Sequence, residues 1–296
     1  MTRVEGDWTV RRILEWTNPF LARKGVDSPR LSAEMLLAHV LAVPRIRLYT
    51  EYDRPLPGTV LAAYRELVRR AAEHEPVAYI TGHAPFFSLD FHVTRDVLIP
   101  RPDTETLVEA SLSIIRRQAG LESPRMLDLC TGTGCVAAAI AFHHKSATIV
   151  AVDSEPRAAA VAVTNIEHLK LSDRVVILIG DLYAPLASEP DKRPFDIIVA
   201  NPPYIRSDQI ATLDKSVRDF EPITALDGGP DGLTIHRRIL AGAAARLSPG
   251  GHLLMEIAFD QGKPALALAA ECPDLTNPRI LKDHAGHDRV LALSKL

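Results

Sequence analysis

The sequence predicts an α/β protein with an open, mostly parallel sheet and an antiparallel last strand, preceded by a small helical bundle. Three observations support this prediction. From residue 125 onward, apolar strand-like runs alternate with helical patterns, and repeated βα units require a parallel sheet with right-handed crossovers. The two closing runs, 279–282 and 289–294, are too close for a crossover, so the last strand must run antiparallel. Before residue 83, apolar residues recur with the helical period.

The N-terminal part of the chain, residues 8–82, has the pattern of several amphipathic helices. Thr9 is the candidate N-cap of the first helix, and the next two helices are predicted over 31–41 and 60–73. Helices of this kind assemble into a small bundle. Because this part has no titratable cluster and no glycine loop, we interpret it as a docking or capping domain.

A β-hairpin is predicted to link the bundle to the rest of the chain. Between Pro76 and Pro102, two short alternating segments are separated by turn residues. Pro102 then suits the start of a helix that runs to Arg117. The predicted organisation is an N-terminal helical docking domain over 1–84, a hairpin linker over 85–100 and a large α/β domain over 101–296.

Seven strands are predicted in the large domain. They cover residues 125–130, 147–153, 174–181, 195–200, 251–257, 279–282 and 289–294. The helices between them are predicted at 135–143, 155–169, 233–247 and 263–271.

Composition narrows the class of protein. The chain has 296 residues and a formal net charge of −3, which gives no support for a general nucleic-acid binder. Cys130, Cys135 and Cys272 are odd in number and lack paired spacing, which argues against a disulfide framework or a structural zinc site. A reducing cytoplasm fits these cysteines best, and neither a membrane-spanning run nor a signal peptide is predicted.

A glycine-containing turn follows the first strand of the large domain. It has the sequence Asp128-Leu-Cys130-Thr131-Gly132-Thr133-Gly134 and leads into a helix. Glycines let the backbone approach a ligand closely, and the helix N-terminus offers free N–H groups. Asp153 ends the next strand, where a carboxylate would accept hydrogen bonds from ribose hydroxyls, and Asp181 ends the third, beside an adenine edge. These strand ends predict a nucleotide-type cofactor site.

Two cofactors compete for this site. The run Gly132-x-Gly134-x-x-Ala137, followed by Asp153, also satisfies the dinucleotide-binding fingerprint. Two features favour S-adenosylmethionine instead. Asp128 places a carboxylate where an amino-acid ammonium would sit, and the antiparallel last strand departs from the usual dinucleotide sheet.

The fourth strand ends in Asn201-Pro202-Pro203-Tyr204. Two prolines end a strand and stiffen the turn, so Asn201 should project its amide at the ligand-binding edge of the sheet. The Asn201 side-chain oxygen and the Pro202 carbonyl can both accept from one –NH2 group, which would aim a planar nitrogen at a methyl donor by positioning, with no strong base. Tyr204 is expected either to pack on the flat substrate group or to be a core or rim aromatic. The structural alternative is a rigid turn after a core strand.

Several longer runs are informative together. They are Glu75-Pro76-Val-Ala-Tyr79-Ile80-Thr-Gly82, Leu98-Ile-Pro100-Arg101-Pro102-Asp103-Thr104-Glu105, Leu127-Asp128-Leu-Cys130-Thr131-Gly132-Thr133-Gly134, Asn201-Pro202-Pro203-Tyr204-Ile205, Phe220-Glu221-Pro222, Ala225-Leu226-Asp227-Gly228-Gly229-Pro-Asp231-Gly232-Leu233 and Asp283-x-x-Gly286-x-x-Arg289-Val290. With these runs the chain resembles, nearly end to end, the HemK/PrmC family of glutamine N5-methyltransferases that modify peptide chain release factors. Adenine and guanine amino-methyltransferases share Asn-Pro-Pro-Tyr, whereas the runs beginning at Pro100 and Gly228 are more specific.

The resemblance implies a Rossmann-like, seven-stranded S-adenosylmethionine-dependent methyltransferase sheet. The cofactor contacts expected are Cys130, Thr131, Gly132, Thr133, Gly134, Asp153, Asp181, Leu182 and Asn201. The substrate glutamine, in the Gly-Gly-Gln loop of class I release factors, is expected to meet Asn201, Pro202, Pro203 and Tyr204, with Asn201, Pro202 and Tyr204 in the catalytic roles. A five-helix N-terminal domain that helps receive the release factor, a monomeric state and a cytoplasmic location are also expected.

Three residues depart from the family pattern. Cys130 stands where glycine is frequent, which is tolerated if this residue does not have a positive φ. Leu182 replaces a common aromatic, so adenine stacking should be weaker there. Ala258 stands where glycine is usual, after Glu256 and Ile257.

Two other functions compete with this one. A DNA or RNA amino-methyltransferase would need a basic channel, and the near-neutral N-terminal part argues against it. A non-enzymatic module that binds translation factors would not need the glycine turn, Asp153 and Asn201. The histidines have no metal-ligand spacing, so no metal is expected. Arg101 is expected either near the cofactor carboxylate or paired with Glu105, and Glu256 is expected to be structural.

Overall fold

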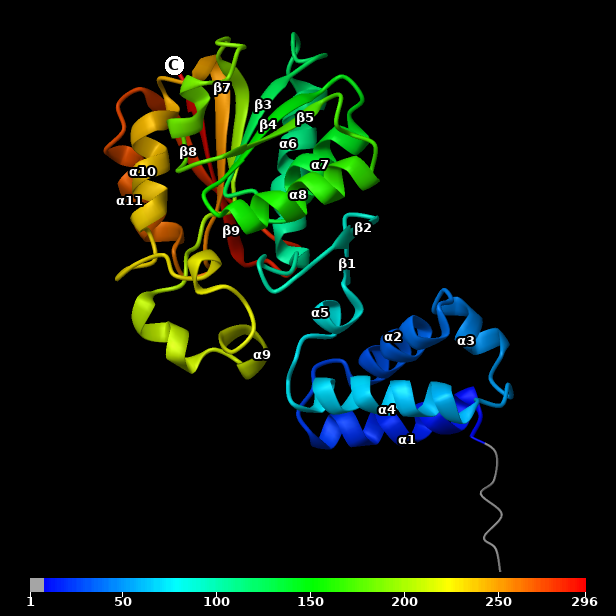
Figure 1. Cartoon of the computed structure of the whole chain (residues 1–296). Helices are drawn as coiled ribbons and strands as arrows, with labels where there is room; N and C mark the ends of the chain where they lie inside the picture. The colour runs from blue at the N-terminus through cyan, green and yellow to red at the C-terminus, as the bar shows by residue number, and fades with distance from the viewer. Residues whose placement is uncertain (1–7) are drawn as a thin grey trace, which may run out of the picture. The chain divides into compact units, whose positions relative to one another are not determined.

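The computed structural model describes residues 8–296, which form two compact units (Figure 1). Of the described residues, one unit contains residues 8–83 together with Asp214–Phe220, and the other contains Ala84–Leu213 and Glu221–Leu296. The segment Asp214–Phe220 is the part that the sequence prediction places in the large domain. Its residues Asp214 and Lys215 line a cavity with Gly25 and His74 of the helical unit.

The helical unit contains five helices in its N-terminal part: α1 Val10–Arg23, α2 Pro29–Leu41, α3 Ile46–Thr50, α4 Gly58–Ala72 and α5 Val77–Thr81. The three predicted helices are confirmed as α1, α2 and α4. Thr9 caps α1, because its hydroxyl accepts a hydrogen bond from Arg12 N at 3.3 Å. The core includes Tyr64, whose hydroxyl donates to Ala33 O at 3.1 Å. Helices α3 and α5 have five residues each, too few for a helical period to be visible in the sequence.

The predicted hairpin is present as β1 His83–Phe86 and β2 Leu89–His92. Its two turn residues, Phe87 and Ser88, both have positive φ, which is the geometry of a two-residue hairpin turn. Pro102 begins the 3₁₀ turn η1 Pro102–Thr104, and α6 Glu105–Arg117 continues from it. The predicted helix start at this proline is therefore confirmed.

The large unit is built on a seven-stranded sheet, as predicted. In chain order its strands are β3 Arg125–Leu129, β4 Thr148–Asp153, β5 Val175–Ile179, β6 Phe195–Ala200, β7 Leu247–Glu256, β8 Leu275–Lys282 and β9 Asp288–Lys295. Their spatial order is β5-β4-β3-β6-β7-β9-β8, and β9 runs antiparallel to both neighbours. The order reverses between β3 and β6, and ligands bind in open α/β sheets beyond the carboxyl ends of the strands at such a point.

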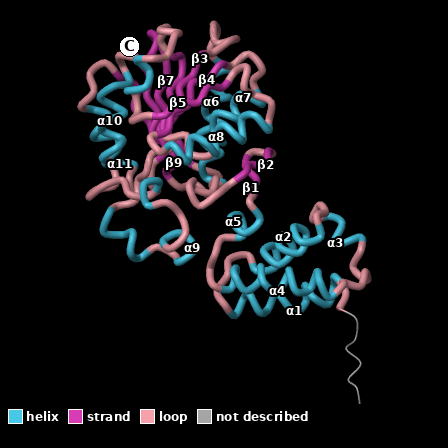
Figure 2. The backbone as a smooth tube through the Cα atoms, in the orientation of Figure 1, coloured by secondary structure: helices cyan, strands magenta, loops and turns pink. Residues whose placement is uncertain are grey.

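Helices cover both faces of this sheet (Figure 2). On one face the core includes residues of α6, α7 Cys135–His143 and α8 Pro156–His168, and on the other it includes residues of α10 Thr234–Ala243 and α11 Gly262–Ala270. Because both faces are buried, the central strands are almost entirely apolar. This double burial leaves the strand ends as the place where polar side chains gather.

Some element boundaries differ from the prediction. Helix α10 ends at Ala243, and β7 already begins at Leu247, which pairs with Phe195 before a register shift. Strand β8 begins at Leu275, four residues before the predicted start. Four short elements were not assigned from the sequence: η2 Ala184–Ala187, η3 Ser207–Thr212, α9 Lys215–Arg218 and η4 Ile223–Ala225. Among residues 8–296, no helix has the length and apolar character needed to cross a membrane.

Candidate functional site

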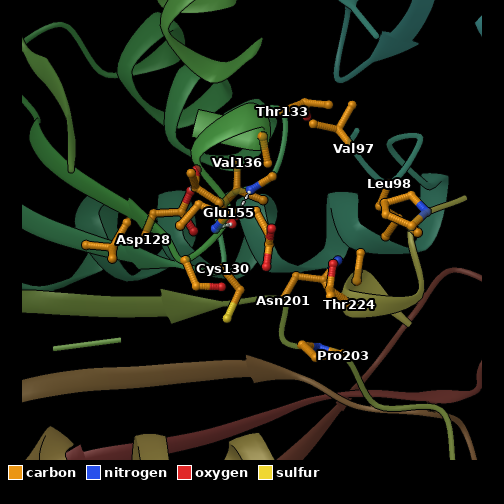
Figure 3. Close-up of a pocket in the computed structure, with 18 of the residues that line it drawn as sticks. Val97, Leu98, Asp128, Cys130, Thr133, Val136, Glu155, Asn201, Pro203 and Thr224 are labelled. Atoms are coloured by element: carbon orange, nitrogen blue, oxygen red, sulfur yellow. Dashed lines mark hydrogen bonds between the residues drawn. The ribbon is translucent and has the colours of Figure 1, made fainter. Parts of the chain in front are cut away.

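A cavity of the large unit lies at the carboxyl ends of β3, β4 and β6 (Figure 3). Its lining includes nine of the predicted site residues: Cys130, Thr131, Gly132, Thr133, Asp153, Asp181, Leu182, Asn201 and Pro203. Gly134, Pro202 and Tyr204 are not part of the lining. The reversal of strand order between β3 and β6 explains why the glycine turn and Asn201, about 70 residues apart in sequence, reach one cavity.

The glycine turn has three residues with positive φ: Cys130 at 59°, Gly132 at 55° and Gly134 at 77°. The turn is closed by a hydrogen bond from Gly134 N to Thr131 O at 2.8 Å. A Cβ atom on Gly132 would have no neighbouring atom within 4 Å, and since this residue lines the cavity, a side chain there would take up cavity space. From the sequence, cysteine is expected to be tolerated at position 130 only if its φ is not positive. Cys130 has a φ of 59°, so this condition is not met.

Replacing Cys130 with glycine should give a more stable protein than replacing it with alanine. Both variants remove the thiol, but a Cβ at positive φ is sterically disfavoured by about 1 kcal/mol, and glycine avoids this strain. Chemical denaturation of the cofactor-free variants should give a free energy of unfolding about 0.5–1 kcal/mol higher for C130G than for C130A. Equal stabilities would mean that the turn relaxes around residue 130.

Two carboxyl groups face this turn from neighbouring strands. Asp153 accepts from Gly132 N at 2.8 Å and from Glu155 N at 3.0 Å, which leaves further lone pairs of its carboxylate for another partner. Asp128 is buried and accepts from the Thr131 hydroxyl at 2.6 Å. Burial raises the pKa of both groups, that of Asp128 to about 7. A cationic ligand group beside Asp128 would favour its ionised form.

Asn201 follows β6 directly, with its side chain at the cavity (Figure 3). Its amide nitrogen Nδ2 donates to the Thr104 hydroxyl oxygen at 3.2 Å. This contact orients the amide and leaves its oxygen Oδ1 as an acceptor for another group. Pro203 lines the cavity as well, whereas Pro202 is buried.

Tyr204 lies away from the cavity lining. Its hydroxyl donates to Glu256 Oε1 at 3.2 Å, and its carbonyl oxygen accepts from Gln261 Nε2 at 2.9 Å. This position agrees with the second expectation, a core or rim aromatic, because Tyr204 does not line the cavity.

The glycine-rich run 228–233 packs on the Asn-Pro-Pro-Tyr loop (residues 201–204). Ile205 N donates to Leu226 O at 3.0 Å, and Gly228 N donates back to Ile205 O at 2.8 Å. A Cβ on Gly228 would lie 2.7 Å from Pro203 O and 2.8 Å from Tyr204 Cα. Only glycine allows this approach, which explains why the two runs occur in the same chain.

Glu256 is the last residue of β7 and has no solvent exposure. Burial raises the pKa of its carboxyl to about 7. Because the folded protein holds this proton more tightly than the unfolded chain, the group contributes most stability below its ordinary pKa of 4.5. That contribution is lost as the pH rises toward 7.

His236 on α10 is a buried residue that sequence analysis did not single out. Its Nε2 lies 2.7 Å from Glu256 O, and since a carbonyl oxygen only accepts, Nε2 must carry the proton. Burial lowers its pKa to about 4, so the ring is neutral at pH 7. In the sequence, a single histidine on the apolar side of a helix gives no sign that it donates a hydrogen bond to the end of a distant strand.

Arg101 lines the cavity and forms an ion pair with the buried carboxylate of Glu221. The expected alternative of a pair with Glu105 is wrong, because Glu105 instead accepts from Phe87 N at 2.9 Å. Glu221 also accepts from Ile99 N at 3.3 Å. Glu221 was not predicted as a site residue, although the Phe-Glu-Pro run that contains it was available as a signal.

Asn165 on α8 is another buried contributor that was missed. Its Oδ1 accepts from His92 N at 2.8 Å, while its Nδ2 donates to His92 O at 3.0 Å and to Thr133 O at 2.9 Å. Asn165 thus joins the end of the hairpin to the glycine turn. The available signal was a polar residue at helical spacing from Val161 and Ala162, on the buried side of its helix.

Four further residues that the sequence analysis considered differ in their exposure to solvent. Asp181 is exposed and forms an ion pair with Arg238, while Leu182 is buried and presents apolar surface to the cavity. His284 and His287 are exposed. In the described part of the chain, no group of histidine, cysteine, aspartate and glutamate side chains is arranged to hold a metal ion.

Two family profiles match the chain. The PrmC N-terminal domain matches residues 12–82, and a family described as conserved hypothetical protein 95 matches residues 93–224. Among curated relatives, the release factor glutamine methyltransferase of Rhodopirellula baltica is 43% identical over 97% of each chain. The protein of the same name from Geobacter sulfurreducens is 41% identical over 98% of each chain.

Solved structures share the fold of the large unit. The hMettl16 catalytic domain in complex with a MAT2A 3′UTR hairpin superposes with a TM-score of 0.54, covering 71% of this chain and 76% of that one. A second METTL16 methyltransferase-domain structure gives a TM-score of 0.52, with 71% and 74% covered. At 18% and 17% sequence identity, these structures are similar in fold.

Proposed function

Because this chain belongs to the release factor glutamine methyltransferase family, it is an S-adenosylmethionine-dependent methyltransferase, and we propose that it methylates the glutamine side-chain amide (N5) in the Gly-Gly-Gln motif of peptide chain release factors. The observation that supports this most directly is the setting of Asn201. Its amide nitrogen is held by Thr104, so its oxygen is left as an acceptor beside the cofactor cavity. That arrangement suits a planar –NH2 group.

The residues present fit the cofactor. A side chain at Gly132 would occupy cavity space, and Asp153 retains acceptor capacity for ribose hydroxyls. We assign cofactor contacts to Asp153, Leu182 and residues 130–133 of the glycine turn, with Leu182 offering apolar contact in place of aromatic stacking. When bound, S-adenosylmethionine supplies an electrophilic methyl group on a sulfonium.

The chain's own part in the reaction is positioning. An amide nitrogen is a weak nucleophile because its lone pair is delocalised. Acceptance of its two hydrogens by Asn201 Oδ1 and by the Pro202 carbonyl would orient the nitrogen and stabilise the positive charge that it gains during attack. The bound donor would supply the methyl group and keep the carbon–sulfur electron pair, and the nitrogen held by Asn201 and Pro202 would pass one proton to water. We assign Pro203 to the wall that confines the flat group and Tyr204 to support of the loop.

We propose that class I release factors are the substrates, that the helical unit helps receive them, and that the protein acts as a cytoplasmic monomer without direct nucleic-acid contact. The free thiols of Cys130, Cys135 and Cys272 suit a reducing compartment, and a net charge of −3 does not suit binding to phosphates. An adenine or guanine amine of DNA or RNA is not favoured as the acceptor.

Methyl transfer to a purified class I release factor tests this function. With radiolabelled S-adenosylmethionine, we expect label on the release factor and at least a 100-fold lower signal on its variant with glutamine replaced by alanine in the Gly-Gly-Gln motif. The difference is expected because the variant lacks the acceptor nitrogen. Total RNA and DNA serve as competing substrates in the same assay. Label on nucleic acid with none on the release factor would contradict the proposal.

A further inference from the structure

Glu256 lies beside the Asn-Pro-Pro-Tyr loop as a consequence of strand register. Ala200 of β6 pairs with Met255 of β7, so the residues that follow, Asn201 and Glu256, are neighbours at the sheet edge. The Glu256 carboxyl group has no solvent exposure, and its Oε1 accepts from the Tyr204 hydroxyl at 3.2 Å. Its Oε2 has no hydrogen-bond partner among the described residues. A buried acid of this kind is costly for stability, which calls for a functional reason.

Thr104 is hydrogen-bonded to Asn201 and also influences the pKa of this carboxyl group. The Thr104 oxygen accepts from Asn201 Nδ2 at 3.2 Å, so the hydroxyl retains its own proton for another acceptor. The neighbouring acceptor is the Glu256 carboxyl, whose pKa the Thr104 hydroxyl lowers. Glu256 therefore contacts one end of the loop through Tyr204, and its pKa responds to the same Thr104 hydroxyl that holds Asn201 at the other end.

The backbone of Glu256 is itself fixed. Its carbonyl oxygen accepts from His236 Nε2 at 2.7 Å, and the next residue, Ile257, donates its N–H to Arg289 O at 2.9 Å. These contacts come from α10 and from the beginning of β9, the strand next to β7 in the sheet. The carboxyl group thus extends from a rigid strand end and not from a mobile loop.

We propose that Glu256 is a positioning residue for methyl transfer, which fixes the direction of the Asn201 amide oxygen through Thr104 and the course of the loop through Tyr204. The inference rests on the proposed function, because it assigns the acceptor nitrogen to this loop. The two prolines stiffen the backbone but leave the Asn201 side chain free to rotate. The hydrogen bond to Thr104 restrains the amide, and in this proposal Glu256 orients Thr104 in turn.

Ionisation of Glu256 should strengthen this restraint. The groups that face the carboxyl are Tyr204 on the loop after β6, Asp103 and Thr104 on η1, and Arg289 on β9. Burial raises its pKa to about 7, so the carboxylate form becomes dominant above neutral pH. A charged acceptor makes shorter and stronger hydrogen bonds with hydroxyl groups than a neutral one. The turnover number should therefore rise as the pH increases from 6 to 8.

Replacement of Glu256 with glutamine keeps the shape of the side chain and removes its charge. At pH 8 and saturating substrates we expect E256Q to lower kcat about 10- to 50-fold and to leave the KM for each substrate within about twofold. The rise of kcat between pH 6 and 8 should become weaker in E256Q, although Asp128, with a pKa also near 7, still titrates there. T104V should show a similar loss, and the double variant should lose at most about twofold more, because both changes break one chain of contacts.

A matched control is available in the helical unit. Glu34 is also buried and accepts from a tyrosine hydroxyl, that of Tyr49, at 2.7 Å. E34Q removes the same charge at the same kind of hydrogen bond, and Glu34 is not among the residues that line the catalytic cavity. Its kcat and pH profile should equal those of the wild type.

Hydrogen–deuterium exchange tests the same inference without any substrate. Amides of residues 204–206 should exchange at least about fivefold faster in E256Q and T104V than in the wild type and E34Q. If the wild type methylates no release factor, the proposed function fails while exchange still decides whether Glu256 holds the loop. Wild-type kcat in E256Q, equal losses of kcat and cofactor affinity, or unchanged exchange in both loop variants would overturn the inference. If E256Q does not fold, the kinetics and exchange of T104V test the inference in its place.

Discussion

Alanine at position 201 is expected to lower kcat for release factor methylation by about 10²–10³-fold while changing the dissociation constant of S-adenosylmethionine less than fivefold. The side chain is assigned one of the two acceptors for the substrate amide, and that role is exerted mainly in the transition state, where the nitrogen becomes positive. The cofactor retains its contacts with the glycine turn and Asp153. Isothermal titration with S-adenosylmethionine and steady-state kinetics measure the two quantities separately.

Asn277 provides the control for this substitution. Its side chain is exposed on β8, the strand at the edge of the sheet, so N277A should retain wild-type kcat. Equal losses of cofactor affinity and turnover in N201A would show that Asn201 acts in cofactor binding and not in orienting the acceptor nitrogen.

Alanine at position 228 should destabilise the protein by about 2–3 kcal/mol and lower kcat at least about 100-fold. The added methyl group would lie within 2.8 Å of three backbone atoms, Gly232 O, Pro203 O and Tyr204 Cα. Backbone cannot move aside as a flexible side chain can, so the Asn-Pro-Pro-Tyr loop must shift. Thermal denaturation and kinetics at saturating substrates measure the two effects.

Gly58 is the matched position for this experiment. It begins α4, and a Cβ added there would meet no atom within 4 Å. G58A should therefore be neutral or slightly stabilising and fully active. A G228A protein with wild-type stability and turnover would show that the loop does not depend on the glycine-rich run for its position.

The sheet could be predicted from the sequence because each strand is an apolar run bounded by polar or glycine residues. The short interval between residues 282 and 289 also sufficed to predict the antiparallel last strand. Strand order, however, depends on how the helices pack across the sheet. The neighbouring positions of Asn201 and Glu256 follow from register and could not be read from a sequence separation of 55 residues.

Part of the cavity lining could also be predicted, because the apolar runs show where each strand ends. Residues at strand ends, such as Asp153 and Asn201, are visible in the sequence because a polar residue interrupts an apolar run. Glu221, His236 and Asn165 act through hydrogen bonds to distant partners, and no local pattern marks such partners. Cysteine itself gives no hint of the positive φ at residue 130, and the signal was the glycine that is frequent at this position in the family that the chain resembles.

The position of Asp214–Phe220 in the helical unit has a consequence for recombination. The chain passes between the two units three times: after His83, before Asp214 and after Phe220. An exchange of N-terminal domains between relatives at residue 84 alone would pair the new helices with a foreign Asp214–Phe220 segment. Such a chimera should fold best when this segment is exchanged together with the first 83 residues. The helical unit is encoded by two separate segments of the gene, and recombination between relatives should keep both segments from the same parent.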